Sequence, residues 1–170
     1  YPDHTQEDEV YNEAEIQRAV QYAKQYPDII KMIAIGNEAM VHWATSYFVS
    51  PSVILKWVNY LQELKSKGDL PSDLWITSSD DFAAWGGASD NYHTEDLNRL
   101  IASVDFVSMH TYAFHNSHYS PDYWYSRDPI LSKIEQIDAS MQRAGEFAIG
   151  QYNDVKEYIL SLGIDKPVHI

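Results

Sequence analysis

Strand-like and helix-like segments alternate along the chain, and this alternation restricts the fold more than any other feature. Four short apolar segments bounded by turn residues predict buried strands: 29–35, 74–78, 104–109 and a last one that begins near Val168. Between them, apolar residues recur every three or four positions, which predicts helices. Strands that alternate with helices are typical of βα units in a parallel sheet. The sequence therefore predicts an α/β fold.

The first three predicted helices carry start or stop signals. The first covers 13–25 and ends where Tyr26 is followed by proline. Ser50 and Pro51 supply a capping hydroxyl and a first-turn proline for the second helix. Thr94 can cap the third helix in the same way as Ser50.

The last predicted helix is long. Asp128-Pro129 is expected to begin it and Gly163 to end it, with Gly145 and Gly150 as candidate breaks. Its apolar residues run in steps of three and four: Ile130, Ile134, Ile137, Met141, Ala144, Ala148, Tyr152, Val155 and Ile159.

Composition excludes several classes of function. With 25 acidic and 12 basic residues, the net charge is −13, so nucleic acid and anionic membranes are not expected partners. The absence of cysteine excludes a disulfide scaffold, a thiol nucleophile and cysteine-ligated metal. No apolar run approaches the roughly 18 residues of a membrane helix. The 13 tyrosines and 5 tryptophans suit stacking on sugar rings or, more plainly, core packing.

Both ends of the sequence suggest part of a longer chain. Tyr1 is not followed by the basic and apolar regions of a signal peptide. Residues 166–170 read as a strand that has only begun. We therefore expect 1–170 to be one partial domain, without a second domain.

Polar side chains follow the predicted strands at their carboxyl ends, where both barrels and doubly wound sheets bind ligands. The first strand ends in Asn37 and Glu38, the second in 78–81 (Ser-Ser-Asp-Asp), and the third in 110–112 (His-Thr-Tyr). The loops beyond are rich in aromatic residues, among them Trp43, Trp85 and Trp124. Glycoside hydrolysis needs a carboxylic acid to protonate the leaving oxygen and rings to hold the sugar. This pattern favours a glycosidase.

Three stretches resemble one clan of enzymes. Residues 33–38, Ile-Ala-Ile-Gly-Asn-Glu, look like strand four of retaining (β/α)8 glycosidases, and the Gly-Asn-Glu form resembles glycoside hydrolase family 17 of β-1,3-glucanases and glucan transferases. Residues 104–112 are similar to strand six of that family, and 166–170 to the beginning of strand seven. The resemblance implies a partial (β/α)8 TIM barrel, about half of it present, with strands four to seven.

The resemblance also implies roles. Glu38 would be the general acid/base of a retaining hydrolase acting on β-linked glucan, expected to be β-1,3-linked, and Asn37 would bind the sugar 2-hydroxyl. The nucleophile would be a glutamate just beyond Ile170, contacted by Tyr112. Further candidates for substrate binding are His110, Asp80, Trp43 and Trp85. No metal or other cofactor is expected. The expected partners are a polysaccharide or oligosaccharide substrate and the remainder of the barrel. The resemblance favours a secreted, periplasmic or cell-surface location.

Alternatives remain open at this stage. Asp80 and Asp81 could be turn residues, Tyr112 and the tryptophans could be packing residues, and His110 could be structural. A glucan transferase would use the same residues as a hydrolase. An inverting glycosidase would pair Glu38 with Asp80 or Asp81. A sugar-binding barrel would lack the nucleophile. A metal hydrolase would use these aspartates with His110, His115 and His118, whose spacing matches no compact metal motif.

Overall fold

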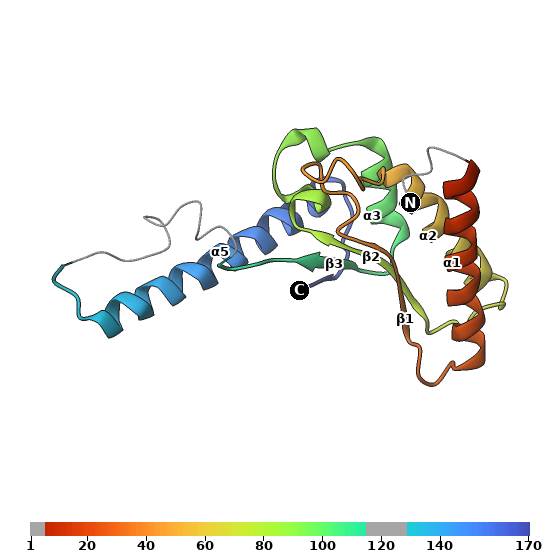
Figure 1. The fold of residues 1–170 in the computed structure, drawn as a ribbon, viewed down its shortest axis with the longest axis horizontal. Coiled ribbons are helices and arrows are strands. Elements are labelled where there is room, and N and C mark those ends of the chain that lie inside the picture. The colour runs from red at the N-terminus through yellow and green to blue at the C-terminus, as the bar shows by residue number, and fades with distance from the viewer. Residues whose placement is uncertain (1–5, 115–128) are drawn as a thin grey trace.

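The computed structural model describes residues 6–114 and 129–170, which form an α/β fold around one parallel sheet (Figure 1). Its strands are β1 (Met32–Asn37), β2 (Trp75–Asp81), β3 (Val107–His110) and β4 (Val168–His169). They lie in the order β1-β2-β3-β4, and every neighbouring pair is parallel. Doubly wound sheets reverse strand order at a switch point, whereas barrel strands follow one another in sequence order. The observed order is that of one arc of a barrel.

Three helices lie where the sequence predicts them, and two of these begin at the predicted residue. They are α1 (Gln6–Gln25), α2 (Pro51–Ser66) and α3 (Glu95–Ser103), with α1 beginning earlier than predicted. The Ser50 hydroxyl accepts a hydrogen bond from the Ser52 N–H, and the Thr94 hydroxyl accepts one from the Leu97 N–H. Both predicted caps are therefore confirmed. No helix in the described ranges is both long enough and apolar enough to cross a membrane.

Helix α5 (Lys133–Ser161) differs from the prediction at its start and in its continuity. It begins at Lys133 because Ser132 and Glu135 form a reciprocal capping box, so the predicted start at 128–129 is wrong. Neither Gly145 nor Gly150 breaks the helix. A glycine inside a helix costs only about 1 kcal/mol relative to alanine, which the other contacts of a 29-residue helix offset.

The apolar stripe of α5 is buried along only part of its length. Ala144, Val155 and Ile159 are buried. Ile134 and Met141, which lie nearer the start of the helix, are 72% and 58% exposed. Figure 1 shows this first half of α5 extending beyond the sheet. The stripe is therefore buried only from Ala144 onward.

The second half of α5 is anchored on η1 (Ala83–Gly87), a π-helical turn that follows β2. Gly86 has φ 89°, and a Cβ there would lie 2.2 Å from the Tyr158 ring. That ring stacks on His93, with centroids 3.9 Å apart, and its hydroxyl donates a hydrogen bond to Asn98. The close approach of ring and backbone requires glycine at position 86.

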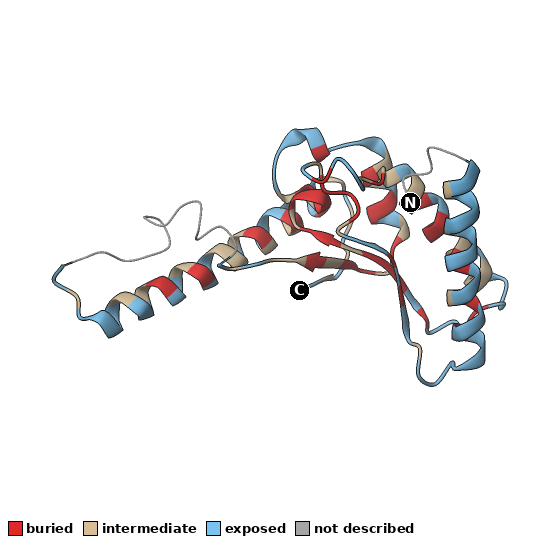
Figure 2. Cartoon of the chain, viewed as in Figure 1, coloured by how far each residue is buried: buried red, intermediate tan, exposed pale blue. Residues whose placement is uncertain are grey.

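Buried residues are concentrated along the strands of the sheet (Figure 2), and the two faces of the sheet differ in burial. Ile33, Ile76 and Met109 are buried on the face that the helices cover. On the opposite face, Met32 is 51% and Trp75 is 46% exposed. In a barrel this second face is the interior. The alternation of side chains along each strand thus decides which residues near the strand ends are covered by helices.

Candidate active site

A bulge in β1 sets the position of Glu38. The pairing between β1 and β2 shifts register between Ala34 and Asn37. Gly36 in this stretch has φ 83°, and Glu38, the residue after Asn37, has φ 47°. Among the described residues, Glu38 is the one non-glycine residue with a positive φ. Bulges and left-handed residues of this kind re-aim side chains beside active sites.

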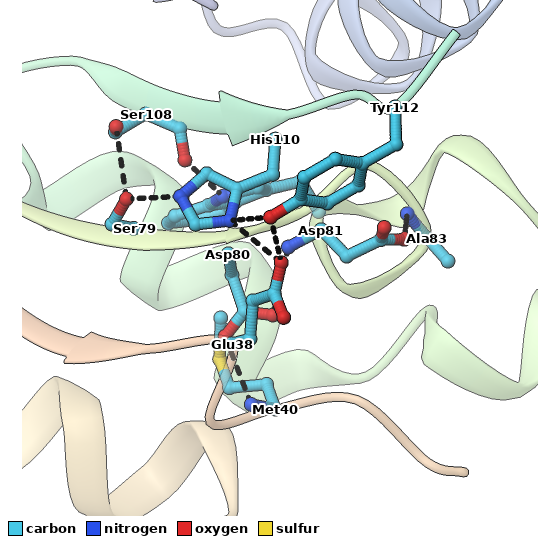
Figure 3. Close-up of polar contacts among 10 residues, drawn as sticks. Glu38, Met40, Ser79, Asp80, Asp81, Ala83, Ser108, His110 and Tyr112 are labelled. Atoms are coloured by element: carbon cyan, nitrogen blue, oxygen red, sulfur yellow. Dashed lines mark hydrogen bonds and ion pairs between the residues drawn. The ribbon is translucent and has the colours of Figure 1, made fainter. Parts of the chain in front are cut away.

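The Glu38 carboxylate lies against two side chains from the end of β3 (Figure 3). Its Oε1 is 2.9 Å from His110 Nδ1 and accepts a hydrogen bond of 2.6 Å from the Tyr112 hydroxyl. The hydrogen bond to Glu38 raises the pKa of the Tyr112 phenol. The resemblance predicts that Tyr112 contacts the nucleophile, whereas its partner in the described residues is the predicted acid/base.

His110 is held from its other side by Ser79, a polar residue of the second strand's end for which the sequence predicts no role in the site. Its Nε2 lies 2.6 Å from the Ser79 hydroxyl, which is 3.3 Å from the Ser108 hydroxyl. Ser79 lies two positions before Asp81 on β2, so both side chains share the inner face. That alternation is the signal that could have identified Ser79, once the face was known.

Adjacent aspartates at the end of β2 point to opposite sides. Asp81 lines the cavity described below, and its carboxylate accepts a hydrogen bond from the Ala83 N–H. Asp80 is 0% exposed and accepts hydrogen bonds from the Met40 and Asp81 N–H groups. Burial raises the pKa of Asp80 to about 6, although these backbone hydrogen bonds lower it. The structure thus differs from the expectation that Asp80 binds substrate.

A cavity of about 510 Å³ opens beside Glu38. Its walls carry two acidic residues and several aromatic rings, together with Ala83, Ala88 and Gln151. The acidic residues are Glu38 and Asp81, and the rings are those of Trp43, Phe82, Tyr92, Tyr112 and Phe147. Carboxylates flanked by ring faces and edges can protonate a glycosidic oxygen and hold sugar rings.

The predicted tryptophans have different surroundings. Trp43 is 62% exposed and lines the cavity. Trp85 is 0% exposed and donates a hydrogen bond to the Ser108 carbonyl, so it supports β3 from the core instead of offering a ring to a sugar. Trp124 lies outside the described residues. Asn37 is exposed at the end of β1, next to Glu38.

Two further cavity residues that the sequence analysis missed connect the loops. The Tyr92 hydroxyl accepts a hydrogen bond from the His42 N–H, and the two rings stack 3.8 Å apart. Gln151 of α5 accepts a hydrogen bond from the Thr111 hydroxyl. Because Thr111 lies between His110 and Tyr112, α5 braces the segment that contacts Glu38.

The described residues contain no group of three or more His, Cys, Asp or Glu side chains placed to hold a metal ion. His115 and His118, which the metal-hydrolase alternative needs, lie outside those residues.

No protein-family model matches the chain, and no curated protein matches it. A crystal structure of an endo-laminarinase from Formosa Hel1_33_131 does match, with 57% sequence identity and a TM-score of 0.89. The match covers 92% of this chain and 40% of the laminarinase chain. The protein is therefore similar, over 92% of its length, to part of a glycosidase, and it spans about 40% of that enzyme's length.

Proposed function

We propose that the protein acts as a retaining glycoside hydrolase that cleaves β-1,3-glucan chains internally, with Glu38 as general acid/base. The observation that carries this proposal is the Glu38 carboxylate, aimed at an aromatic-lined cavity by a bulge and contacted by His110 and Tyr112. The similarity to an endo-laminarinase supports the substrate and the internal cleavage. Within the clan, the Gly-Asn-Glu sequence favours family 17.

The mechanism has two steps. In the first, Glu38 protonates the leaving glycosidic oxygen while a carboxylate nucleophile attacks the anomeric carbon and forms a glycosyl enzyme. We infer that this nucleophile is a glutamate just after Ile170. Because all four strands are parallel, the carboxyl ends of β4 and β1 lie at the same end of the sheet. A glutamate after β4 would therefore lie at the same end as Glu38, and retention requires the two carboxyl groups about 5 Å apart.

In the second step, Glu38 takes a proton from a water molecule whose oxygen attacks the anomeric carbon. This attack breaks the bond to the nucleophile and releases the sugar with its anomeric configuration retained. His110 and Tyr112 would hold the carboxylate in place through both steps. The aromatic rings of the cavity would bind the sugar units, and a neutral polymer carries no charge that the chain's net charge of −13 would repel.

The test is the change Glu38→Gln in the full-length protein, assayed on laminarin. Removal of the acid should lower kcat by about 10²- to 10⁴-fold. Glu63→Gln is the matched control, because Glu63 lies exposed on α2 and pairs with Lys67, away from the cavity. Unchanged turnover by Glu38→Gln would refute the assignment of the acid/base.

Product analysis of the wild-type reaction tests the remaining parts of the proposal. Internal cleavage should release oligosaccharides of several lengths from the start, and retention should give the β-anomer first. Products longer than the starting oligosaccharide would indicate a glucan transferase. An α-anomer formed first would indicate inversion and a carboxyl separation of roughly 6.5–9.5 Å.

A further inference from the structure

Asp80 is the most deeply buried carboxylate described near the site, and it does not reach the cavity. It lies on β2 among the residues of the helix-covered face and is 0% exposed. A buried carboxylate costs free energy unless hydrogen bonds compensate for the lost water. Burial raises the pKa of Asp80, and N–H groups of Met40, Asp81 and Ala39 lower it. The positions of these N–H groups in the chain show which backbone segment the buried carboxylate contacts.

Two of the three N–H groups belong to the residues that directly follow Glu38. The Met40 N–H donates to Asp80 Oδ2 over 2.8 Å, and the neighbouring Ala39 N–H lowers the pKa of the same carboxyl group. On the preceding side, the Glu38 N–H donates to the Ser79 carbonyl over 2.9 Å. Neighbouring residues of β2 therefore hold the backbone on both sides of Glu38.

Glu38, which lies between these contacts, has an unfavourable backbone conformation. Glu38 has φ 47°, and an L-residue with a side chain rarely keeps a left-handed conformation unless its surroundings impose it. With this backbone, its carboxylate reaches His110 and Tyr112. A relaxed backbone would turn the side chain elsewhere.

We propose that Asp80 is a positioning residue, whose carboxylate holds the backbone after Glu38 and thereby keeps the Glu38 side chain against His110 and Tyr112. This inference rests on the proposed role of Glu38 as acid/base. Asp80 itself contacts neither substrate nor the reacting atoms.

The test is Asp80→Asn in the full-length protein. The amide has the same shape but only one acceptor oxygen, and its NH₂ group faces N–H donors. The control is Asp105→Asn, because Asp105 also accepts a hydrogen bond from a backbone N–H, that of Ile76, but lies outside the cavity lining. We expect Asp80→Asn to lower kcat on laminarin by about 10- to 100-fold with KM little changed, and Asp105→Asn to leave kcat unchanged.

A second substrate separates positioning from a general loss of structure. An aryl β-glucoside oligomer with a dinitrophenolate leaving group needs little protonation. If Asp80 acts through the acid Glu38, Asp80→Asn should lose much less activity on this substrate than on laminarin. Three results would overturn the proposal. They are equal losses of activity on both substrates, a raised KM with normal kcat, and a lower melting temperature without any loss of kcat.

A crystal structure of the variant tests the inference independently of the reaction. In Asp80→Asn, the contact of 2.9 Å between Glu38 and His110 should be lost and φ of Glu38 should become negative. An unchanged Glu38 would refute the positioning role even if the enzyme proved to have another substrate. If Asp80→Asn does not fold, Asp80→Ser, which keeps one acceptor and leaves room for water, gives the same comparisons. Failure of Glu38→Gln to reduce activity would instead refute the proposed function.

Discussion

Replacing Gly86 with alanine should destabilise the protein by about 2–5 kcal/mol, the sum of two effects. A left-handed conformation costs an alanine about 1–2 kcal/mol, and Gly86 has φ 89°. Inserting a methyl group into a packed site costs about 1–3 kcal/mol more. Here the new Cβ would lie 2.2 Å from the Tyr158 ring, which cannot move aside easily because it stacks on His93 and donates a hydrogen bond to Asn98.

Thermal unfolding of the full-length protein, followed by calorimetry, measures this loss as a fall in melting temperature of several degrees. Gly145→Ala is the matched control. Gly145 lies within α5 with no heavy atom within 4 Å of a new Cβ, so alanine should be neutral or stabilise the helix by about 0.5–1 kcal/mol. Equal melting temperatures for Gly86→Ala and Gly145→Ala would refute the reasoning about the Tyr158 contact.

Two other changes test the contacts around the sheet. Tyr112→Phe removes a hydrogen bond to the Glu38 carboxylate from a half-exposed ring and should lower kcat on laminarin about tenfold, with an unchanged kcat as the contradicting result. Asp105→Asn should lower the melting temperature at pH 7, because burial of Asp105 is outweighed by hydrogen bonds from Lys65 and the Ile76 N–H, which lower the pKa of the carboxyl group. A lowered pKa of Asp105 stabilises the folded protein at pH values above the ordinary carboxyl pKa of about 3.9, and this stabilisation is lost as the pH falls. The melting temperatures of variant and wild type should therefore converge in acid. A difference that stays constant with pH would contradict this explanation.

Local signals in the sequence were sufficient to predict most elements. The hydroxyl of Ser50 before Pro51 and the hydroxyl of Thr94 act over one helical turn, so a single sequence reveals them. The start of α5 was mispredicted because Asp128-Pro129 has the composition of a helix start, whereas the reciprocal pair Ser132 and Glu135 forms the actual cap.

The site was only partly predictable because it depends on strand faces and register. The residues after each strand marked Glu38, His110 and Tyr112, which the structure brings together. The sequence could not show which of two adjacent aspartates points inward, since a shift of one residue exchanges the faces of a strand. Asp80 was therefore expected in the substrate site, and Ser79 was not selected although it contacts His110.

The sequential order of the strands has a consequence for folding during synthesis. Because each strand pairs with the one translated before it, the sheet can grow at one edge as the chain leaves the ribosome. Asp80 follows Met40 by 40 residues, and His110 follows Glu38 by 72. At about 5–20 residues per second, the nascent chain waits several seconds between the appearance of Glu38 and that of its last partners. Glu38 is thus synthesised early, but the contacts that hold its strained backbone and side chain can form only after two further strands have emerged.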